Sequence, residues 1–171
     1  MGKYKVIDGN EACAHISYMF TEIAGIYPIT PASPMSEYID KWSTEGRLNL
    51  FNNKVKLIEM QSEAGAIALV HGSLQTGSLA STYTASQGLL LMIPSMYKIA
   101  GEMLPCVINV ASRTIATHAL SIFGDHSDIY ASRSTGFCFL ASSSVEDTIY
   151  MTLASYLSTL KGKLPFVNFF D

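Results

Sequence analysis

The spacing of hydrophobic and polar residues divides the chain into alternating helices and strands. Apolar positions at helical intervals, or apolar on every side, predict helices over residues 8–25, 33–46, 63–77, 86–104 and 144–162. Short apolar or β-branched runs predict strands over residues 55–59, 79–84, 106–111, 137–141 and 166–170. This regular alternation is typical of strand–helix–strand units.

Capping residues and glycines predict where the helices begin and end. The first helix is expected to stop at Gly25, and Ser33 is expected to cap the second, with Pro34 in its first turn. The last helix is expected to begin after Ser144 and to stop at Gly162. These signals set the boundaries of the predicted elements.

Two further segments have distinctive patterns. Pro28 and Pro31 push the residue before each of them into an extended conformation, which places Thr30 at a strand end. The segment 86–104 is apolar on all sides, which predicts a central helix that is covered all round and is kinked or divided by Pro94.

The order of the elements predicts the fold class. Strands joined through helices, several of them too apolar to face water, indicate a doubly wound α/β fold with a mostly parallel sheet and helices on both faces. In such sheets ligands collect beyond the carboxyl ends of the strands, where Thr30, the Gln61–Glu63 turn, Ser86-Gln87 and Arg113 are all expected. We expect residues 1–171 to form a single domain, because no linker or repeat interrupts them.

Composition limits the partners and the compartment. Only 15% of residues are charged and 49% are hydrophobic, so we expect part of the surface to be buried against a partner chain or further domains, and homo-oligomers are favoured. A net charge of -3 without a basic cluster argues against nucleic acid and anionic membranes. The longest apolar run, residues 88–93, is too short to span a membrane. Three widely spaced cysteines are typical of reduced, buried thiols, which favours the cytoplasm.

Glu63 and Arg113 are the strongest candidates for chemistry. Glu63 opens a helix, where the dipole and the free N–H groups stabilise a carboxylate, and the small residues that follow it allow close approach by a ligand or another helix. Arg113 follows a buried strand. It could clamp a carboxylate with its planar fork of donors, or it could form an ion pair with a local acid.

Other motifs favour structural roles. Ser86 lies at a strand-to-helix turn, but no GxSxG motif surrounds it, so a helix cap is favoured over a nucleophile. His15 and His71 fall within helices, where hydrogen-bonded structural histidines are common. A turn and helix cap is favoured over a metal site for the cluster His118, Asp125, His126 and Asp128. The chain contains neither a GxGxxG nor a GxxxxGK[ST] sequence, so a self-sufficient nucleotide site is not expected.

Long stretches of the chain are recognisable together. They are YPITPASPMSEYIDKW (27–42), EMQSEAGAIALVHGSLQTG (59–77), TYTASQGLLLMIPSMYKIAGEMLP (82–105), SRTIATHALSIFGDHSDIYASRSTGF (112–137) and the closing PFVNFFD. On these stretches the chain resembles the N-terminal domain of pyruvate:ferredoxin (flavodoxin) oxidoreductases. Members of that multidomain family use thiamine diphosphate, coenzyme A and iron–sulfur clusters to convert pyruvate to acetyl-CoA and carbon dioxide, and they pass the electrons to ferredoxin or flavodoxin.

The resemblance implies roles for three residues. Glu63 in SEAG matches the glutamate that hydrogen-bonds the aminopyrimidine ring of thiamine diphosphate. Thr30 in YPITP and Arg113 in SRT match the residues that hold the pyruvate carboxylate, as a hydroxyl donor and a cationic fork.

The chain lacks other parts of the family's machinery. No GDG-type motif for the diphosphate and Mg²⁺, no cysteine motif for iron–sulfur clusters and no coenzyme A domain is present in it. We therefore expect half a site, completed by other domains or subunits and inactive alone. The alternative is a non-catalytic assembly or regulatory module that retains the fold.

Overall fold

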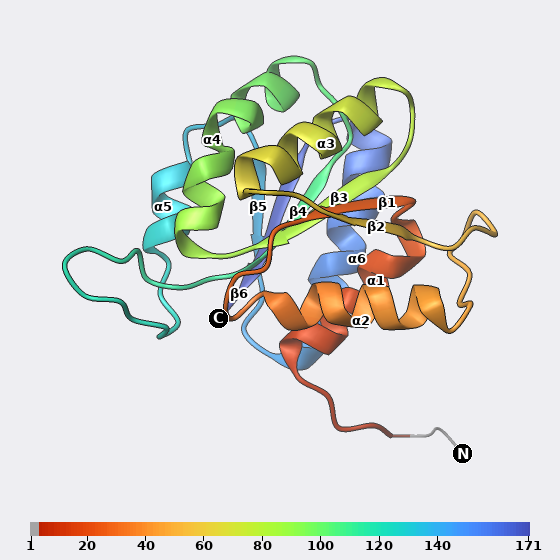
Figure 1. The fold of residues 1–171 in the computed structure, drawn as a ribbon, viewed down its shortest axis with the longest axis horizontal. Coiled ribbons are helices and arrows are strands. Elements are labelled where there is room, and N and C mark those ends of the chain that lie inside the picture. Colours follow the sequence, from red (N-terminus) through yellow and green to blue (C-terminus); the bar gives the residue numbers. More distant parts are fainter. Residues whose placement is uncertain (1–3) are drawn as a thin grey trace.

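A single sheet of six parallel strands forms the centre of the computed structural model, which describes residues 4–171 (Figure 1). The strand order is β2-β1-β3-β4-β6-β5. The strands are β1 (Ile23–Ile26), β2 (Lys56–Glu59), β3 (Ala80–Thr84), β4 (Val107–Ala111), β5 (Cys138–Ala141) and β6 (Phe166–Phe170). The helices are α1 (Gly9–Phe20), α2 (Ser33–Thr44), α3 (Glu63–Gln75), α4 (Ser86–Gly101), α5 (Ser127–Ser132) and α6 (Val145–Gly162).

Helices cover both faces of the sheet. Helices α3, α4 and α5 pack on one face, and α1, α2 and α6 pack on the other (Figure 1). The larger core lies between the sheet and α3 and α4, where the fully buried side chains include Ile67, Val70, Leu89, Met92 and Met96. The predicted doubly wound α/β fold is therefore confirmed.

Several buried polar residues on the side of the sheet that α1 and α6 cover are paired with one another. Strand β3 is fully buried although its sequence is ASTYT. The Ser81 hydroxyl is 2.9 Å from Thr21 Oγ1 and 2.7 Å from the Tyr156 hydroxyl. Asn109 and Asn168 are opposite one another in the β4–β6 pairing, and Asn168 Nδ2 donates to Asn109 Oδ1 at 3.2 Å. These bonds satisfy groups whose burial would otherwise be costly.

Most predicted boundaries agree with the structure. The last strand has the predicted bounds, and α3 begins at Glu63. The Ser144 hydroxyl caps α6 by accepting from the Asp147 N–H at 3.1 Å. These segments are defined by local capping and patterning signals, which the sequence contains in full.

The prediction of one helix over residues 8–25 was wrong. Helix α1 ends at Phe20, and Gly25 lies inside β1. A Cβ atom at Gly25 would lie 2.8 Å from the carbonyl oxygen of Ala66 in α3. This glycine therefore permits close packing of α3 on the strand instead of ending a helix, and Thr30 lies in the turn between β1 and α2.

The predictions for Ser33, Gly162 and Pro94 have different outcomes. Ser33 is the first residue of α2 and does not cap it, since the cap position is Ala32 and makes no side-chain bond. Helix α6 ends at Gly162 as predicted, but the residue in the left-handed conformation is the following one, Lys163, with φ 52°. Of the two alternatives for Pro94, division of the helix is wrong, because α4 is a single helix with Pro94 inside it.

Helix α4 is not covered all round in residues 4–171. Leu91 is 51% exposed and Tyr97 is 50% exposed, while the opposite face packs on the sheet. An apolar sequence pattern cannot distinguish a face that other parts of this chain cover from one left open to a partner.

Within residues 4–171, no helix has both the length and the hydropathy needed to cross a membrane.

The three cysteines are free thiols. Cys13 and Cys106 are completely buried, and burial raises the pKa of each thiol to about 12. Cys138 is only half-buried, so its predicted burial was partly wrong. Cys13 and Cys106 are therefore uncharged at neutral pH.

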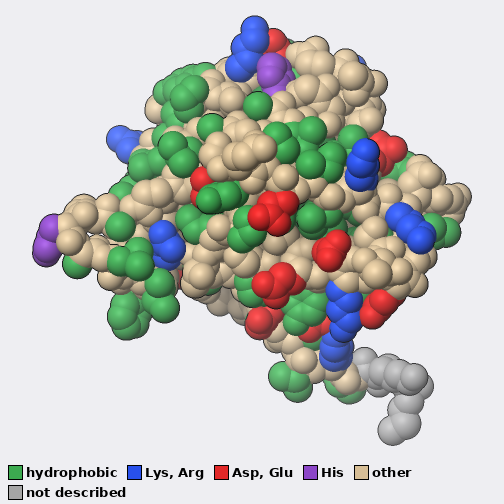
Figure 2. Space-filling model, in the orientation of Figure 1, with side chains coloured by type: hydrophobic (Ala, Val, Ile, Leu, Met, Phe, Trp, Pro, Cys, Tyr) green, Lys and Arg blue, Asp and Glu red, His purple; other side chains and the backbone are tan. Residues whose placement is uncertain are grey.

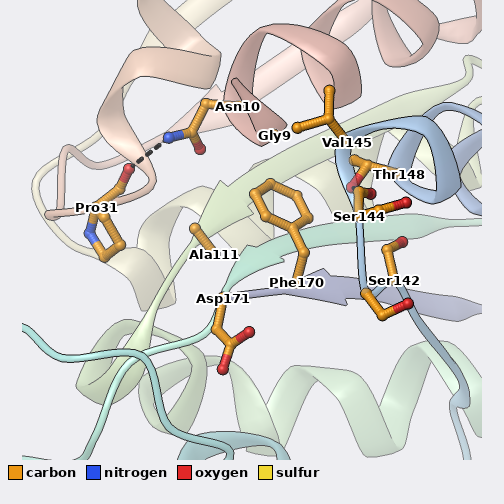
Figure 3. A pocket seen from close by; sticks show the side chains of 11 residues that line it. Gly9, Asn10, Pro31, Ala111, Ser142, Ser144, Val145, Thr148, Phe170 and Asp171 are labelled. Atoms are coloured by element: carbon orange, nitrogen blue, oxygen red, sulfur yellow. Dashed lines mark hydrogen bonds between the residues drawn. The ribbon is translucent and has the colours of Figure 1, made fainter. Parts of the chain in front are cut away.

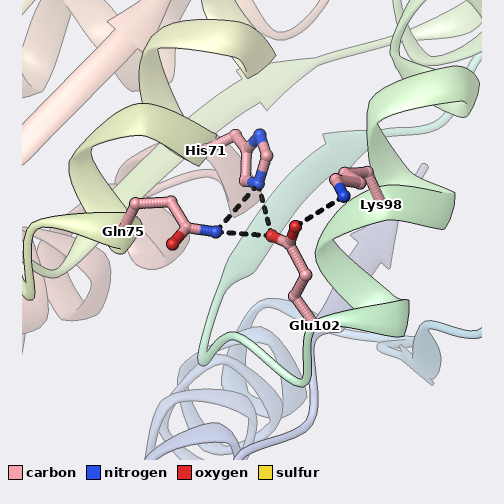
Figure 4. Close-up of polar contacts among 4 residues, drawn as sticks. All are labelled: His71, Gln75, Lys98 and Glu102. Carbon is pink, nitrogen blue, oxygen red and sulfur yellow. Dashed lines mark hydrogen bonds and ion pairs between the residues drawn. The ribbon is translucent and has the colours of Figure 1, made fainter.

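A polar cluster joins α3 to the end of α4 (Figure 4). The Glu102 carboxylate is 2.6 Å from His71 Nε2 and accepts from Gln75 Nε2 at 2.5 Å and Lys98 Nζ at 2.8 Å. The hydrogen bond from Lys98, followed by that from His71, lowers the pKa of Glu102 to about 2. His71 thus has the structural role that its helical position predicted.

Replacing Gly25 by alanine tests the contact between β1 and α3. The added Cβ meets backbone, which cannot rotate away, so Gly25→Ala should reduce the free energy of unfolding by about 1–3 kcal/mol. The matched control is Gly72→Ala in α3, where an added Cβ has no neighbour within 4 Å. That change should leave stability unchanged or raise it by up to about 1 kcal/mol. Urea denaturation measures both, and equal effects would contradict the packing role of Gly25.

The Glu102 cluster predicts a pH dependence of stability. A lowered carboxyl pKa means that the cluster stabilises the fold above pH 4.5 and that this contribution is lost as the pH falls toward 2. Wild type should therefore be more stable than Glu102→Gln at pH 6, and the difference should shrink between pH 5 and pH 3. Glu45→Gln, at an exposed site, is the control. A constant difference between wild type and Glu102→Gln in urea denaturation would refute the prediction.

Candidate active site

The carboxyl ends of all six strands lie at one edge of the sheet, because every neighbouring pair is parallel. Thr30 follows β1, Glu63 follows β2, Ser86 follows β3 and Arg113 follows β4. The edge predicted from the order of elements is thus present, and the central strands bring their following turns into contact there.

Arg113 is a buried cation without an acidic partner. Its side chain is 6% exposed; Nη1 donates to the Thr30 carbonyl oxygen at 2.8 Å and Nη2 donates to Gln87 Oε1 at 3.0 Å. Its Nε is buried and makes no hydrogen bond. No acidic side chain within residues 4–171 forms an ion pair with the guanidinium. The alternative prediction, an ion pair with a local acid, is therefore wrong.

A buried guanidinium with neutral acceptors only is costly unless an anion approaches it. Thr30 contributes its main-chain carbonyl to Arg113, while its exposed side chain makes no hydrogen bond to the described residues 4–171. The Thr30 hydroxyl is thus free to donate a hydrogen bond to a ligand, and the neighbouring Arg113 guanidinium is not paired with an acidic side chain of residues 4–171. This arrangement is suited to a carboxylate.

Glu63 is a buried carboxylate at the start of α3. It is 5% exposed, and it accepts no hydrogen bond from the part of the chain that the structure describes. A Cβ atom at Gly88 would lie 2.8 Å from Glu63 Oε1 and would overlap Thr84 Oγ1, which is buried and without a partner. The predicted close approach to Glu63 is therefore made partly by α4, through Gly88.

One buried acid joins the turns after β3 and β4. Asp128 is completely buried, and its Oδ2 accepts from the Ser86 N–H at 2.8 Å and from the Arg113 N–H at 3.1 Å. Its Oδ1 accepts from the Ile129 N–H at 2.8 Å. Burial raises the pKa of Asp128, and these hydrogen bonds oppose the rise. Asp128 therefore sets the spacing between the two turns that carry the site.

Sequence reasoning considered Asp128 only as a member of a doubtful metal cluster. No group of three or more His, Cys, Asp or Glu residues able to hold a metal ion occurs within residues 4–171. Gln87 was expected at this edge but was given no role, and Gly88 was missed. The sequence signal for both is their position at the turn from β3 into α4, and no comparable signal pointed to Asp128.

Ser86 is neither the cap of α4 nor an activated nucleophile. The cap position is Ala85, and the Ser86 hydroxyl lies 2.5 Å from Gln87 Oε1 and 2.8 Å from the Thr114 carbonyl oxygen. None of the histidines in residues 4–171 hydrogen-bonds to it. Its φ of 48° makes the sharp turn into α4. The helix-cap prediction for Ser86 was therefore wrong in detail, and the residue is structural.

A cavity of about 300 Å³ opens at the same edge (Figure 3). It lies between the starts of α1 and α6, and Asn10 Nδ2 donates to the Pro31 carbonyl oxygen beside it at 3.2 Å. Its lining includes Pro31, the neighbour of Thr30, but neither Glu63 nor Arg113. The three predicted residues, Thr30, Glu63 and Arg113, therefore lie at this edge of the sheet but outside the cavity.

Comparison with known proteins identifies the family. The family described as "Pyruvate flavodoxin/ferredoxin oxidoreductase, thiamine diP-bdg" matches residues 16–171. The chain belongs to this family. It is 58% identical to the pyruvate:ferredoxin oxidoreductase of Moorella thermoacetica over 98% of this chain and 14% of that protein. It is 54% identical to a pyruvate-flavodoxin oxidoreductase of Nostoc sp. (strain ATCC 29151 / PCC 7119) over 96% of this chain and 41% of that protein.

The fold also has a solved counterpart. A 2-oxoglutarate:ferredoxin oxidoreductase from Magnetococcus marinus, with 2-oxoglutarate, coenzyme A and succinyl-CoA bound, superimposes with a TM-score of 0.81. The match covers 95% of this chain and 28% of that one at 21% sequence identity, so it establishes the fold alone. The chain spans about 14% of the length of the oxidoreductases of Moorella thermoacetica and Klebsiella pneumoniae that it matches.

Proposed function

We propose that this chain forms one wall of the active site of a thiamine-diphosphate-dependent oxidoreductase that acts on pyruvate. The observation that carries the proposal is the buried Arg113 guanidinium, which has only neutral acceptors and lies beside Thr30. Arg113 binds the carboxylate of the 2-oxoacid as a cationic fork, and the Thr30 hydroxyl donates a further hydrogen bond. The choice of pyruvate follows from the family, because these two residues suit any 2-oxoacid.

Glu63 and its surroundings fit the aminopyrimidine of thiamine diphosphate. The Glu63 side chain is 5% exposed and accepts no hydrogen bond within residues 4–171, and Gly88 leaves the space beside its Oε1 free of a side chain. Glu63 would hold the aminopyrimidine ring by sharing a proton with one of its ring nitrogens. When bound, thiamine diphosphate supplies the nucleophilic carbon and the electron sink for decarboxylation of the 2-oxoacid.

Other cofactors belong outside this chain. Residues 4–171 contain no cluster suited to a metal ion, and the sequence has no GDG-type motif or cysteine motif. We place the diphosphate contacts, Mg²⁺, coenzyme A and the iron–sulfur clusters in further domains or subunits. These partners also pass electrons to ferredoxin or flavodoxin.

Exposed apolar side chains support burial against such partners. The loop that projects from the molecule at the left of Figure 1 carries apolar side chains in Figure 2, and Leu120, Ile122 and Phe123 on it are 71%, 62% and 82% exposed. Surfaces of this kind mark contacts with other proteins. We propose a single-domain unit of a cytoplasmic homo-oligomer, without nucleic-acid or membrane contacts.

Glu63→Gln tests the role of the carboxylate. An amide cannot share the proton in the same way, so the variant in the assembled oxidoreductase should lose kcat for pyruvate by about 100-fold or more. Its thermal unfolding should change little, because the carboxylate makes no hydrogen bond to residues 4–171. Glu45→Gln, at an exposed site far from the edge, should keep full activity. A Glu63→Gln enzyme with wild-type kcat would refute the proposal.

The 171 residues alone should be inactive, because they hold only part of the site. Pyruvate decarboxylation with added thiamine diphosphate, Mg²⁺ and an artificial electron acceptor should be at background, and activity should appear once the remaining parts of the enzyme are supplied. Turnover by the isolated chain at ordinary enzymatic rates would contradict the half-site. Failure of the completed assembly to turn over would instead favour a non-catalytic module.

A further inference from the structure

The side-chain amide of Gln87 has one orientation, which its hydrogen bonds determine. Its Oε1 lies 3.0 Å from Arg113 Nη2 and 2.5 Å from the Ser86 hydroxyl, and its Nε2 donates to the Ala116 carbonyl oxygen at 3.1 Å. A reversed amide would place its NH₂ group against the guanidinium and its oxygen against a carbonyl. The oxygen of Gln87 therefore faces Arg113.

The backbone around this contact is also fixed. The N–H groups of Ser86 and Arg113 both donate to the same oxygen of Asp128, at 2.8 Å and 3.1 Å. The turn at Ser86 is sharp, with φ 48°, and Gln87 is the next residue. The main chain at residues 86 and 113 is thus held in place from both sides, and the Gln87 side chain lies against the Arg113 guanidinium.

The chemical nature of residue 87 decides the charge of the site. Thr30 contributes a carbonyl and Gln87 contributes an amide oxygen, so both acceptors orient Arg113 without neutralising it. A glutamate at position 87 would accept the same hydrogen bond but would pair with the guanidinium as an ion. An approaching anion would then meet a neutral ion pair in place of a cation.

We propose that Gln87 is a positioning residue that aims Arg113 at the substrate carboxylate and, because it is neutral, leaves the charge of Arg113 available to that carboxylate. This inference rests on the proposed function, in which Arg113 binds a 2-oxoacid. It assigns to the turn at residues 86–88 a role in both halves of the site, because Gly88 lies against Glu63.

The test compares Gln87→Glu and Gln87→Met with wild type in the assembled oxidoreductase that contains this chain. Gln87→Glu should raise KM for pyruvate about tenfold or more, the loss expected for one charge-assisted hydrogen bond, and should change kcat less than threefold. The inhibition constant of oxamate, an unreactive carboxylate of similar shape, should rise by the same factor. Gln87→Met keeps the charge of Arg113 but loses its alignment, so its KM should rise less than that of Gln87→Glu.

Controls separate this effect from general damage and from failure of the proposed function. Asn53→Asp makes the same amide-to-carboxylate change at an exposed site before β2 and should leave KM unchanged. Circular dichroism melting identifies a variant that does not fold. If Gln87→Glu does not fold, the proposal is tested on Gln87→Met: a raised KM for pyruvate and a raised inhibition constant for oxamate support it, and unchanged values refute it.

Arg113→Ala gives the reference for losing the clamp. If Arg113→Ala raises KM while folded Gln87 variants match wild type, the inference about Gln87 is wrong and the proposed function stands. If Arg113→Ala leaves KM for pyruvate unchanged, the proposed function of Arg113 and the inference both fail. A fall in kcat alone for Gln87→Glu, with KM and the oxamate constant unaltered, would also refute a role in carboxylate binding.

Discussion

Parallel pairing of the six strands is the constraint on which the site depends. Every parallel connection must return the chain to the opposite end of the sheet, so the turns that follow the strands gather at one edge and the helices cover both faces. The central strands β3 and β4 are consequently buried along their whole length. Residues that are far apart in sequence, such as Thr30 and Arg113, come within hydrogen-bond distance there.

Three buried charged residues at this edge, Asp128, Arg113 and Glu63, differ in how far hydrogen bonds from the protein compensate for their burial. Asp128 receives three backbone N–H groups, which compensate for its burial and hold two turns together. Arg113 has two neutral acceptors and an unpaired Nε, and Glu63 accepts no hydrogen bond within residues 4–171. Asp128 is therefore complete as a structural group. The side chains of Arg113 and Glu63 have no charged partner within residues 4–171, and this supports the binding roles proposed for them.

Two glycines allow main-chain segments to pack closely near Glu63, and this packing fixes the position of its carboxylate. Gly25 lets α3 pack on β1, which fixes the start of α3 and therefore Glu63, and Gly88 lets the first turn of α4 pass against the same carboxylate. The small residues after Glu63 belong to the same arrangement. Neither glycine serves mainly for conformational freedom, since both lie within a strand or helix and what matters is the absence of a Cβ.

The sequence by itself determined the features that depend on local signals. The α/β class, the bounds of β6, the start of α3 at Glu63 and the capping of α6 by Ser144 all follow from periodicity and capping, which act over a few residues. Only the tertiary structure decided that Gly25 belongs to a strand and that one face of α4 is open. It also decided that the Arg113 guanidinium has no acidic partner, that it donates to Gln87, and that Asp128 accepts from the main-chain N–H of Arg113. These outcomes depend on contacts between segments dozens of residues apart, and the spacing of residues along a chain carries no information about which distant groups will share a buried edge.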